Sequence, residues 1–262
     1  MLNIIVCIKQ VLDPEAPAST YKVDSEMKRI IQQGVPPVMS PFDENALEAA
    51  LRIRNGQQAK IKVLSLGRNL SKPVLRKSLA AGADELILLE DDTFDNLDSC
   101  ATASILAAAI KKIGEYDIIL TGRQAADWNA GIVGSTIAEI LGIPGITSAR
   151  GVEIVDRKVR VKKVTLDGFD ELVASLPVLV TLSNEVGELR ATPLKEIMAA
   201  QKKPLTIWKA GDIGVEPLKL KRTKLLKLFI PQREAICETV AGETEEERGA
   251  NLALKLREQH LI

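Results

Sequence analysis

Histidine is almost absent from this sequence, since His260 is the only one among 262 residues. It stands two residues before the C-terminal end, where chains commonly fray. Histidine-dependent nucleophilic catalysis and histidine-rich metal sites both need an imidazole held firmly in the fold. The sequence therefore argues against both kinds of site, and it predicts no catalytic residue of its own.

Cysteine is also scarce. Cys7, Cys100 and Cys237 are odd in number and widely spaced, and no two of them form a Cys-x-x-Cys pair. This pattern argues against a disulfide framework and against a structural zinc site. We therefore expect a reducing compartment and a cytoplasmic protein.

Aromatic residues, net charge and long hydrophobic runs are missing too. Aromatic residues make up only 3% of the chain, which argues against stacking platforms for single-stranded nucleic acid. Lys and Arg total 35, as do Asp and Glu, so no overall field attracts nucleic acid or an anionic membrane. No hydrophobic run approaches the roughly 20 residues of a membrane-spanning helix. We expect a protein that binds no nucleic acid, is not inserted in a membrane and recognises its partners locally.

Two standard ligand motifs are missing as well. Neither G-x-G-x-x-G nor G-x-x-x-x-G-K-[ST] occurs, so no standard phosphate motif applies. The acidic run from Glu90 to Asp98 lacks the regular ligand spacing and the glycine of an EF-hand. We interpret it as a solvated loop, with a metal site as the less favoured alternative.

A regular alternation of strand and helix patterns is what the sequence does contain. Strands are predicted over residues 4–8, 61–67, 85–90 and 117–120, and helices from 41 and over 71–82, 99–113 and 132–141. Such alternation predicts a parallel sheet with helices on both faces. A period-two hairpin over 152–168 and strands over 169–174 and 177–182 extend the same sheet. The predicted fold class is α/β, a doubly wound, mostly parallel sheet extended by an antiparallel hairpin.

The chain is predicted to divide into a nucleotide-binding α/β domain over residues 1–203 and a C-terminal arm over 204–262. The arm is long, charged and poor in strand patterns, and it ends in an amphipathic helix that begins after Thr244. Because this arm has few ways to pack against its own sheet, it is predicted to wrap a partner subunit. Before it, Thr192 is the predicted N-cap of a helix over 195–202, and residues 14–37 are predicted to form a long loop with at most a small hairpin.

The connection between the strand at 117–120 and the helix at 132–141 is the candidate ligand site. It contains small or polar residues that let a backbone turn sharply and approach a ligand, namely Thr121, Gly122, Asn129, Gly131 and Gly134. In open α/β sheets, ligands bind beyond the carboxyl ends of the strands, where a helix N-terminus offers free N–H groups to an anion. We interpret this connection as a phosphate cradle; the alternative is an ordinary strand-to-helix loop that binds nothing.

Five segments, in order along the chain, resemble the β-subunit of electron transfer flavoproteins. They are Ile5–Asp13, Met39–Glu48, Ala80–Asp84, Thr121–Asp127 and Arg190–Met198. The resemblance implies a heterodimer with an α-subunit that holds an FAD. It implies an electron carrier subunit rather than a catalyst, which passes electrons from flavin dehydrogenases, such as the acyl-CoA dehydrogenases of fatty acid oxidation, to a membrane quinone oxidoreductase. It also implies a second nucleotide in this subunit, either AMP or, in the electron-bifurcating type that takes electrons from NADH, a second FAD.

The resemblance also implies site residues. Those of the nucleotide pocket are Cys7, Ser40, Pro41, Phe42, Asp43, Leu66, Gly122, Arg123, Gln124, Ala125, Asp127, Trp128, Asn129, Gly131, Ile132 and Val133. Leu194 and Arg190 are implied to dock a dehydrogenase, and the alternative for Leu194 is ordinary helix packing. Trp128 is expected either to stack on a base or to pack at the surface. Thr165 stands where the family has a glutamate near the partner's flavin.

A hypothesis of another class is a stand-alone nucleotide-sensing α/β protein. It predicts a self-sufficient homodimer with no use for residues beyond Pro204. The arm therefore favours the heterodimeric interpretation.

Overall fold

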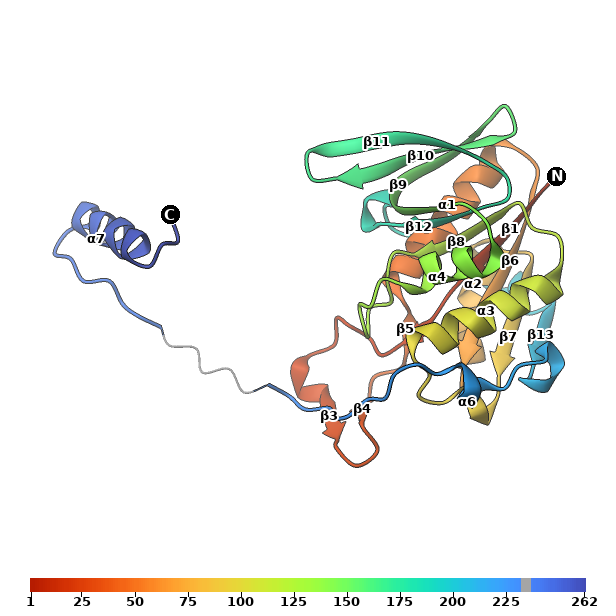
Figure 1. The fold of residues 1–262 in the computed structure, drawn as a ribbon, viewed down its shortest axis with the longest axis horizontal. Helices are drawn as coiled ribbons and strands as arrows, with labels where there is room; N and C mark the ends of the chain where they lie inside the picture. The colour runs from red at the N-terminus through yellow and green to blue at the C-terminus, as the bar shows by residue number, and fades with distance from the viewer. Residues whose placement is uncertain (232–236) are drawn as a thin grey trace.

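The computed structural model describes residues 1–231 and 237–262, and its centre is a nine-stranded sheet (Figure 1). Seven strands are parallel, in the order β9, β12, β8, β1, β6, β7 and β13. Their bounds are β1 Leu2–Cys7, β6 Ala59–Gly67, β7 Glu85–Glu90, β8 Ile118–Gly122, β9 Gly145–Val155, β12 Val178–Leu182 and β13 Leu205–Trp208. Strands β10 (Lys158–Thr165) and β11 (Gly168–Ser175) continue the sheet antiparallel beyond β9. The predicted fold class is confirmed.

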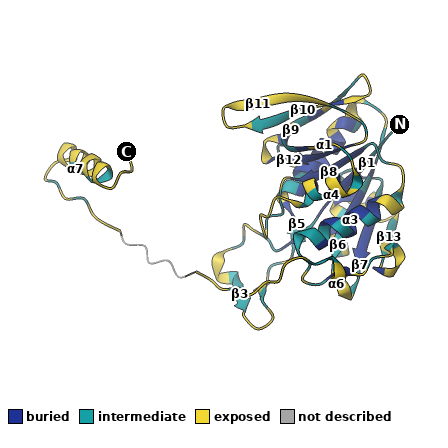
Figure 2. Cartoon of the chain, viewed as in Figure 1, coloured by how far each residue is buried: buried dark blue, intermediate teal, exposed yellow. Residues whose placement is uncertain are grey.

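Helices cover both faces of the sheet. The helices of the described residues are α1 Pro41–Gly56, α2 Lys72–Ala81, α3 Ser99–Ile113, α4 Val133–Leu141, α5 Leu194–Ala200, α6 Pro217–Leu220 and α7 Glu245–Glu258, of which α7 does not cover the sheet (Figure 1). Alternate residues of β1 point to opposite faces, so Ile4 belongs to the buried cluster that contains Leu47 of α1, whereas Ile5 belongs to the cluster that contains Ile110 of α3. The two buried layers, dark blue in Figure 2, follow from this alternation.

Short connecting elements complete the fold. They are strands β2 Gln10–Val11, β3 Tyr21–Asp24, β4 Arg29–Gln32 and β5 Val38–Met39, and 3-10 helices Ala18–Thr20, Asp92–Phe94, Asn184–Val186 and Gly211–Ile213. β3 and β4 pair antiparallel, so the loop over residues 14–37 contains the small hairpin that the sequence allows. The turn between β9 and β10 has positive φ at Asp156 and Arg157, which is typical of tight hairpin turns.

Two local predictions differ from the structure. Thr192 does not cap α5; Pro193 is the N-cap residue because its ψ of 150° keeps it extended, and no side chain caps the helix. Strand β13 lies within the segment that the sequence analysis assigned to the arm, where few strand patterns were seen. It pairs only with β7 at the sheet edge, so four residues of modest burial suffice. The chain therefore leaves the sheet after Trp208.

The last helix, α7, stands apart from the sheet (Figure 1). The Thr244 side chain accepts a hydrogen bond from the backbone N–H of Glu247, as the capping pattern predicts. No residue of α7 is buried, and Figure 2 draws it largely as exposed. Across the described ranges 1–231 and 237–262, no helix combines the length and the apolar character that crossing a bilayer requires.

Candidate functional site

A cavity of about 760 Å³ lies at the carboxyl ends of the parallel strands. Cys7 at the end of β1, Leu66 in β6 and Gly122 at the end of β8 line it. The chain winds from β1 through β6 to β7 and then returns to β8 on the other side of β1. The cavity therefore sits at the point where the strand order reverses, which is where open α/β sheets bind their ligands.

Most of the sixteen predicted pocket residues line this cavity. Those in its wall are Cys7, Asp43, Leu66, Gly122, Arg123, Gln124, Ala125, Trp128, Gly131 and Val133. Three others contact a lining residue: the Phe42 ring lies 4.9 Å from the Arg123 guanidinium, Asp127 pairs with Lys9 at 2.6 Å, and Asn129 accepts a 2.9 Å hydrogen bond from Gln124.

The remaining three predicted residues lie outside the wall. The Ser40 side chain is fully buried, and its Oγ has no hydrogen-bond partner among the described residues. Pro41 and Ile132 are exposed to solvent. The structure therefore brings the strand ends and the β8–α4 connection together, whereas these three residues do not line the cavity.

The N-terminus of α4 meets the cavity through Val133 and Gly134. The first N–H groups of a helix have no intrahelical acceptor, and no side chain caps them here. A Cβ added at Gly134 would lie 2.6 Å from Thr181 Cγ2, so glycine lets the helix approach β12 closely. These unpaired donors and the positive end of the helix dipole favour an anion at this point.

Asp43 ties three elements together beside the cavity. Its carboxylate accepts the backbone N–H of Lys9 at 2.8 Å and that of Gly122 at 3.0 Å, so α1 holds the ends of β1 and β8. Burial raises the pKa of Asp43 to about 7, and the two backbone hydrogen bonds offset only part of this effect. Burial, with the nearby Asp43 charge, raises the pKa of Cys7 to about 12, so this thiol stays protonated and is no nucleophile.

Basic side chains outnumber acidic ones in the cavity wall. The bases are Lys9, Lys28, Arg68, Arg123, Lys221 and Lys224, and the acids are Asp43 and Asp98. The sequence analysis missed Lys28, Arg68, Asp98 and the segment at 221–225, because they come from the β3–β4 turn, the end of β6, the start of α3 and the chain after α6. An acidic residue directly before the α3 pattern was the one signal available for Asp98.

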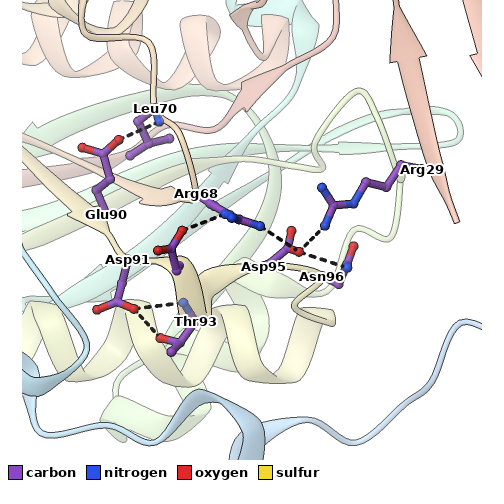
Figure 3. Close-up of polar contacts among 9 residues, drawn as sticks. Arg29, Arg68, Leu70, Glu90, Asp91, Thr93, Asp95 and Asn96 are labelled. Atoms are coloured by element: carbon purple, nitrogen blue, oxygen red, sulfur yellow. Dashed lines mark hydrogen bonds and ion pairs between the residues drawn. The ribbon is translucent and has the colours of Figure 1, made fainter. Parts of the chain in front are cut away.

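The acidic run makes local contacts that Figure 3 shows. Asp92 pairs with the Arg68 guanidinium at 2.8 Å, and Asp95 contacts both Arg68 and Arg29. Asp91 accepts hydrogen bonds from the backbone N–H and the hydroxyl of Thr93. Among the described residues, no group of His, Cys, Asp and Glu could hold a metal ion. These carboxylates therefore fix the β3–β4 hairpin and Arg68 beside the cavity.

An apolar surface lies away from the cavity, on α5. Leu194 is 71% exposed and Met198 is 67% exposed. The loop before α5 is held by α1, because the Glu48 carboxylate accepts the Arg190 side chain at 2.9 and 3.0 Å and its backbone N–H at 3.2 Å. Arg190 thus faces its own chain, whereas Leu194 projects outward.

Together, the doubly wound sheet and the cavity at its switch point define an α/β protein of the class that binds ligands beyond the carboxyl ends of its strands. A family model, the Electron transfer flavoprotein domain, matches residues 28–213. The chain belongs to the electron transfer flavoprotein family.

The chain is similar to curated proteins over all or nearly all of its length. The chain is 38% identical to an electron transfer flavoprotein subunit beta of Thermoanaerobacterium thermosaccharolyticum, and 37% identical to the caffeyl-CoA reductase-Etf complex subunit CarD of Acetobacterium woodii. Both comparisons cover 100% of each chain. It is also 34% identical to protein FixA of Azorhizobium caulinodans, over 93% of this chain and 90% of the relative.

Proposed function

We propose that this chain is the β-subunit of a heterodimeric electron transfer flavoprotein and that it holds a second nucleotide in the cavity beside β1. It passes electrons from flavin dehydrogenases, through an FAD held with an α-subunit, to a membrane quinone oxidoreductase. The observation that carries the proposal is the uncapped start of α4 in a wall where bases outnumber acids. The arm beyond Trp208 binds the α-subunit. Helix α7 has no buried residue, so it offers a large exposed surface for this contact.

The residues present fit a nucleotide. The N–H groups of Val133 and Gly134 and the Arg123 guanidinium suit phosphate oxygens, and the exposed Trp128 ring can stack on a base. A bound flavin supplies the redox chemistry, and this chain binds it, orients it and excludes water. The cytoplasmic, dehydrogenase-linked role in fatty acid oxidation stays a proposal that rests on the family.

The electron-bifurcating type, with a second FAD that takes electrons from NADH, is the second candidate. The cavity volume of about 760 Å³ supports it, because it lies in the upper part of the range for ligand pockets, roughly 300–1,000 Å³. The likeness to a subunit of a caffeyl-CoA reductase-Etf complex also supports it. In that form, the heterodimer has oxidoreductase activity; with AMP, the subunit is an electron carrier.

Denaturing the purified heterodimer is expected to release one FAD and one further nucleotide. A flavin as the second nucleotide indicates bifurcation, and AMP indicates the ordinary type. Arg123→Ala should weaken retention of this nucleotide about 10- to 150-fold, because one charge-assisted contact contributes about 1.5–3 kcal/mol. Arg157→Ala, in the exposed β9–β10 turn, is the matched control. Chromatography that finds a single flavin and no adenylate would overturn the proposal.

Leu194→Ala is expected to lower kcat/KM for reduction by an acyl-CoA dehydrogenase about 10-fold or more, while flavin content stays unchanged. An exposed apolar anchor contributes about 2 kcal/mol when a partner buries it. Leu194 is 71% exposed in this chain, so its removal costs little stability. Val173→Ala, 61% exposed on β11, is the control. Equal rates for the two variants would leave Leu194 without a docking role.

A further inference from the structure

Residues 221–225, which we call the strap, lie in the first part of the arm and form one wall of the cavity. Lys221, Thr223, Lys224 and Leu225 line the cavity, although they lie about 100 residues beyond the cradle in sequence. Figure 1 shows this part of the chain running from α6 towards β3 and β4. The ligand site and the arm are therefore continuous along the chain.

Two other side chains that line the cavity, Asp98 and Lys28, hold the strap. Oδ2 of Asp98 accepts the backbone N–H groups of Arg222 and Thr223 at 2.5 and 2.6 Å and the Thr223 hydroxyl at 3.1 Å. Its Oδ1 caps α3 by accepting the Ala101 N–H at 2.8 Å. At the other end, Lys28 Nζ donates to the Leu225 carbonyl at 3.0 Å. A few polar contacts hold the strap, and no helix or strand includes it.

Repulsion between basic side chains disfavours this position of the strap unless an anion lies nearby. Residues 219–227 contain five basic side chains and no acidic one. Lys221 and Lys224 share the cavity wall with Lys28, and none of the three forms an ion pair among the described residues. Like charges in one cavity wall repel each other, and an anionic ligand between them would attract all three.

We propose that the strap is a movable wall of the nucleotide site, that Lys221 and Lys224 contact the anionic part of the ligand, and that Asp98 is the positioning residue that joins this wall to α3. The strap is part of the arm, so nucleotide binding and α-subunit binding both favour the same position of this segment and strengthen each other. This coupling rests on the proposed function, which supplies both the ligand and the partner.

Asp98→Asn in the full heterodimer tests the coupling. Asparagine still caps α3, but its NH₂ group then faces the strap N–H groups, so the strap is released while the helix is kept. We expect AMP and FAD, measured separately as probes, to dissociate about 10-fold faster. We also expect either probe to tighten the α–β complex at least 5-fold in the parent protein and by less than 2-fold in the variant.

Lys221→Ala/Lys224→Ala leaves the α3 cap untouched and should produce the same faster release. Asp156→Asn, in the β9–β10 turn where asparagine suits the positive φ, is the control and should match the parent. Unchanged release in both strap variants overturns this inference alone. A parent protein that binds neither AMP nor FAD overturns the proposed function and this inference together.

Discussion

Asp43→Ala is expected to lower the free energy of unfolding by about 2–4 kcal/mol at pH 5, since it leaves two N–H groups without their acceptor. Those groups belong to Lys9 and Gly122, at the ends of β1 and β8. The three elements that Asp43 joins also form the cavity wall, so nucleotide retention should fall with stability. Urea unfolding of the purified chain and of the heterodimer measures the first effect, and bound-nucleotide analysis measures the second.

The same substitution should change the dependence of stability on pH. The pKa of Asp43 is about 7 in the folded protein and 3.8 without the fold, so between these values the folded state holds the extra proton. The free energy of unfolding therefore falls as pH rises through this window, by up to about 1.4 kcal/mol per pH unit. Asp43→Ala removes this slope, so its cost is largest at pH 5 and smaller at pH 8.

Asp24→Ala is the matched control, because Asp24 also accepts two backbone N–H groups, from Glu26 and Met27 at 3.1 and 2.9 Å. These bonds lie in a surface turn, where water replaces the lost acceptor. We expect a loss of less than about 1 kcal/mol and an unchanged pH slope. Equal effects of the two substitutions would contradict the role given to Asp43.

Glu48→Ala is expected to cost about 2–3 kcal/mol and to raise KM for the dehydrogenase more than it lowers kcat. Breaking a buried ion pair costs about 3–5 kcal/mol, and we discount this because the Arg190 side chain is 35% exposed. The Glu48 side chain is only 6% exposed, and its loss frees the loop that presents Leu194. Urea unfolding and steady-state kinetics of the heterodimer measure the two effects.

The contribution of Glu48 to the free energy of unfolding changes with pH in the opposite direction to that of Asp43. Burial raises the pKa of Glu48, but hydrogen bonds from Arg190 and Arg52 together lower it below its ordinary value of 4.5. Its stabilising contribution is therefore present above pH 4.5 and is lost as pH falls through the lower folded-state pKa. The variant and the parent should converge in stability at acid pH.

A charge-matched control variant and a double-mutant cycle separate the contribution of the Glu48–Arg190 ion pair from other effects of the substitution. Glu139→Ala, on the exposed side of α4, should leave stability and KM within experimental scatter. Arg190→Lys keeps the charge but loses the forked contact, so an intermediate effect is expected. Adding Arg190→Ala to Glu48→Ala should cost little more; additive losses would show that the two side chains act independently.

Most secondary structure could be predicted because periodicity is local. The predicted helix at 99–113 coincides with α3, and the strand at 61–67 lies within β6. The convergence of Cys7 and Gly122 at one sheet edge also followed, since parallel strands end on the same side. Strand β13 was missed because an edge strand needs few buried residues, and Thr192 was a wrong cap because the backbone of Pro193 stays extended.

By itself, the sequence determined the doubly wound sheet, the β8–α4 connection and the family, because these depend on short-range patterns and on ordered segments. Only the tertiary structure decided that Glu48 accepts hydrogen bonds from Arg190, 142 residues away, and that Asp98 binds the strap at Thr223, 125 residues away. Contacts between residues so far apart depend on how the layers pack, and no local pattern of side chains encodes which partners meet.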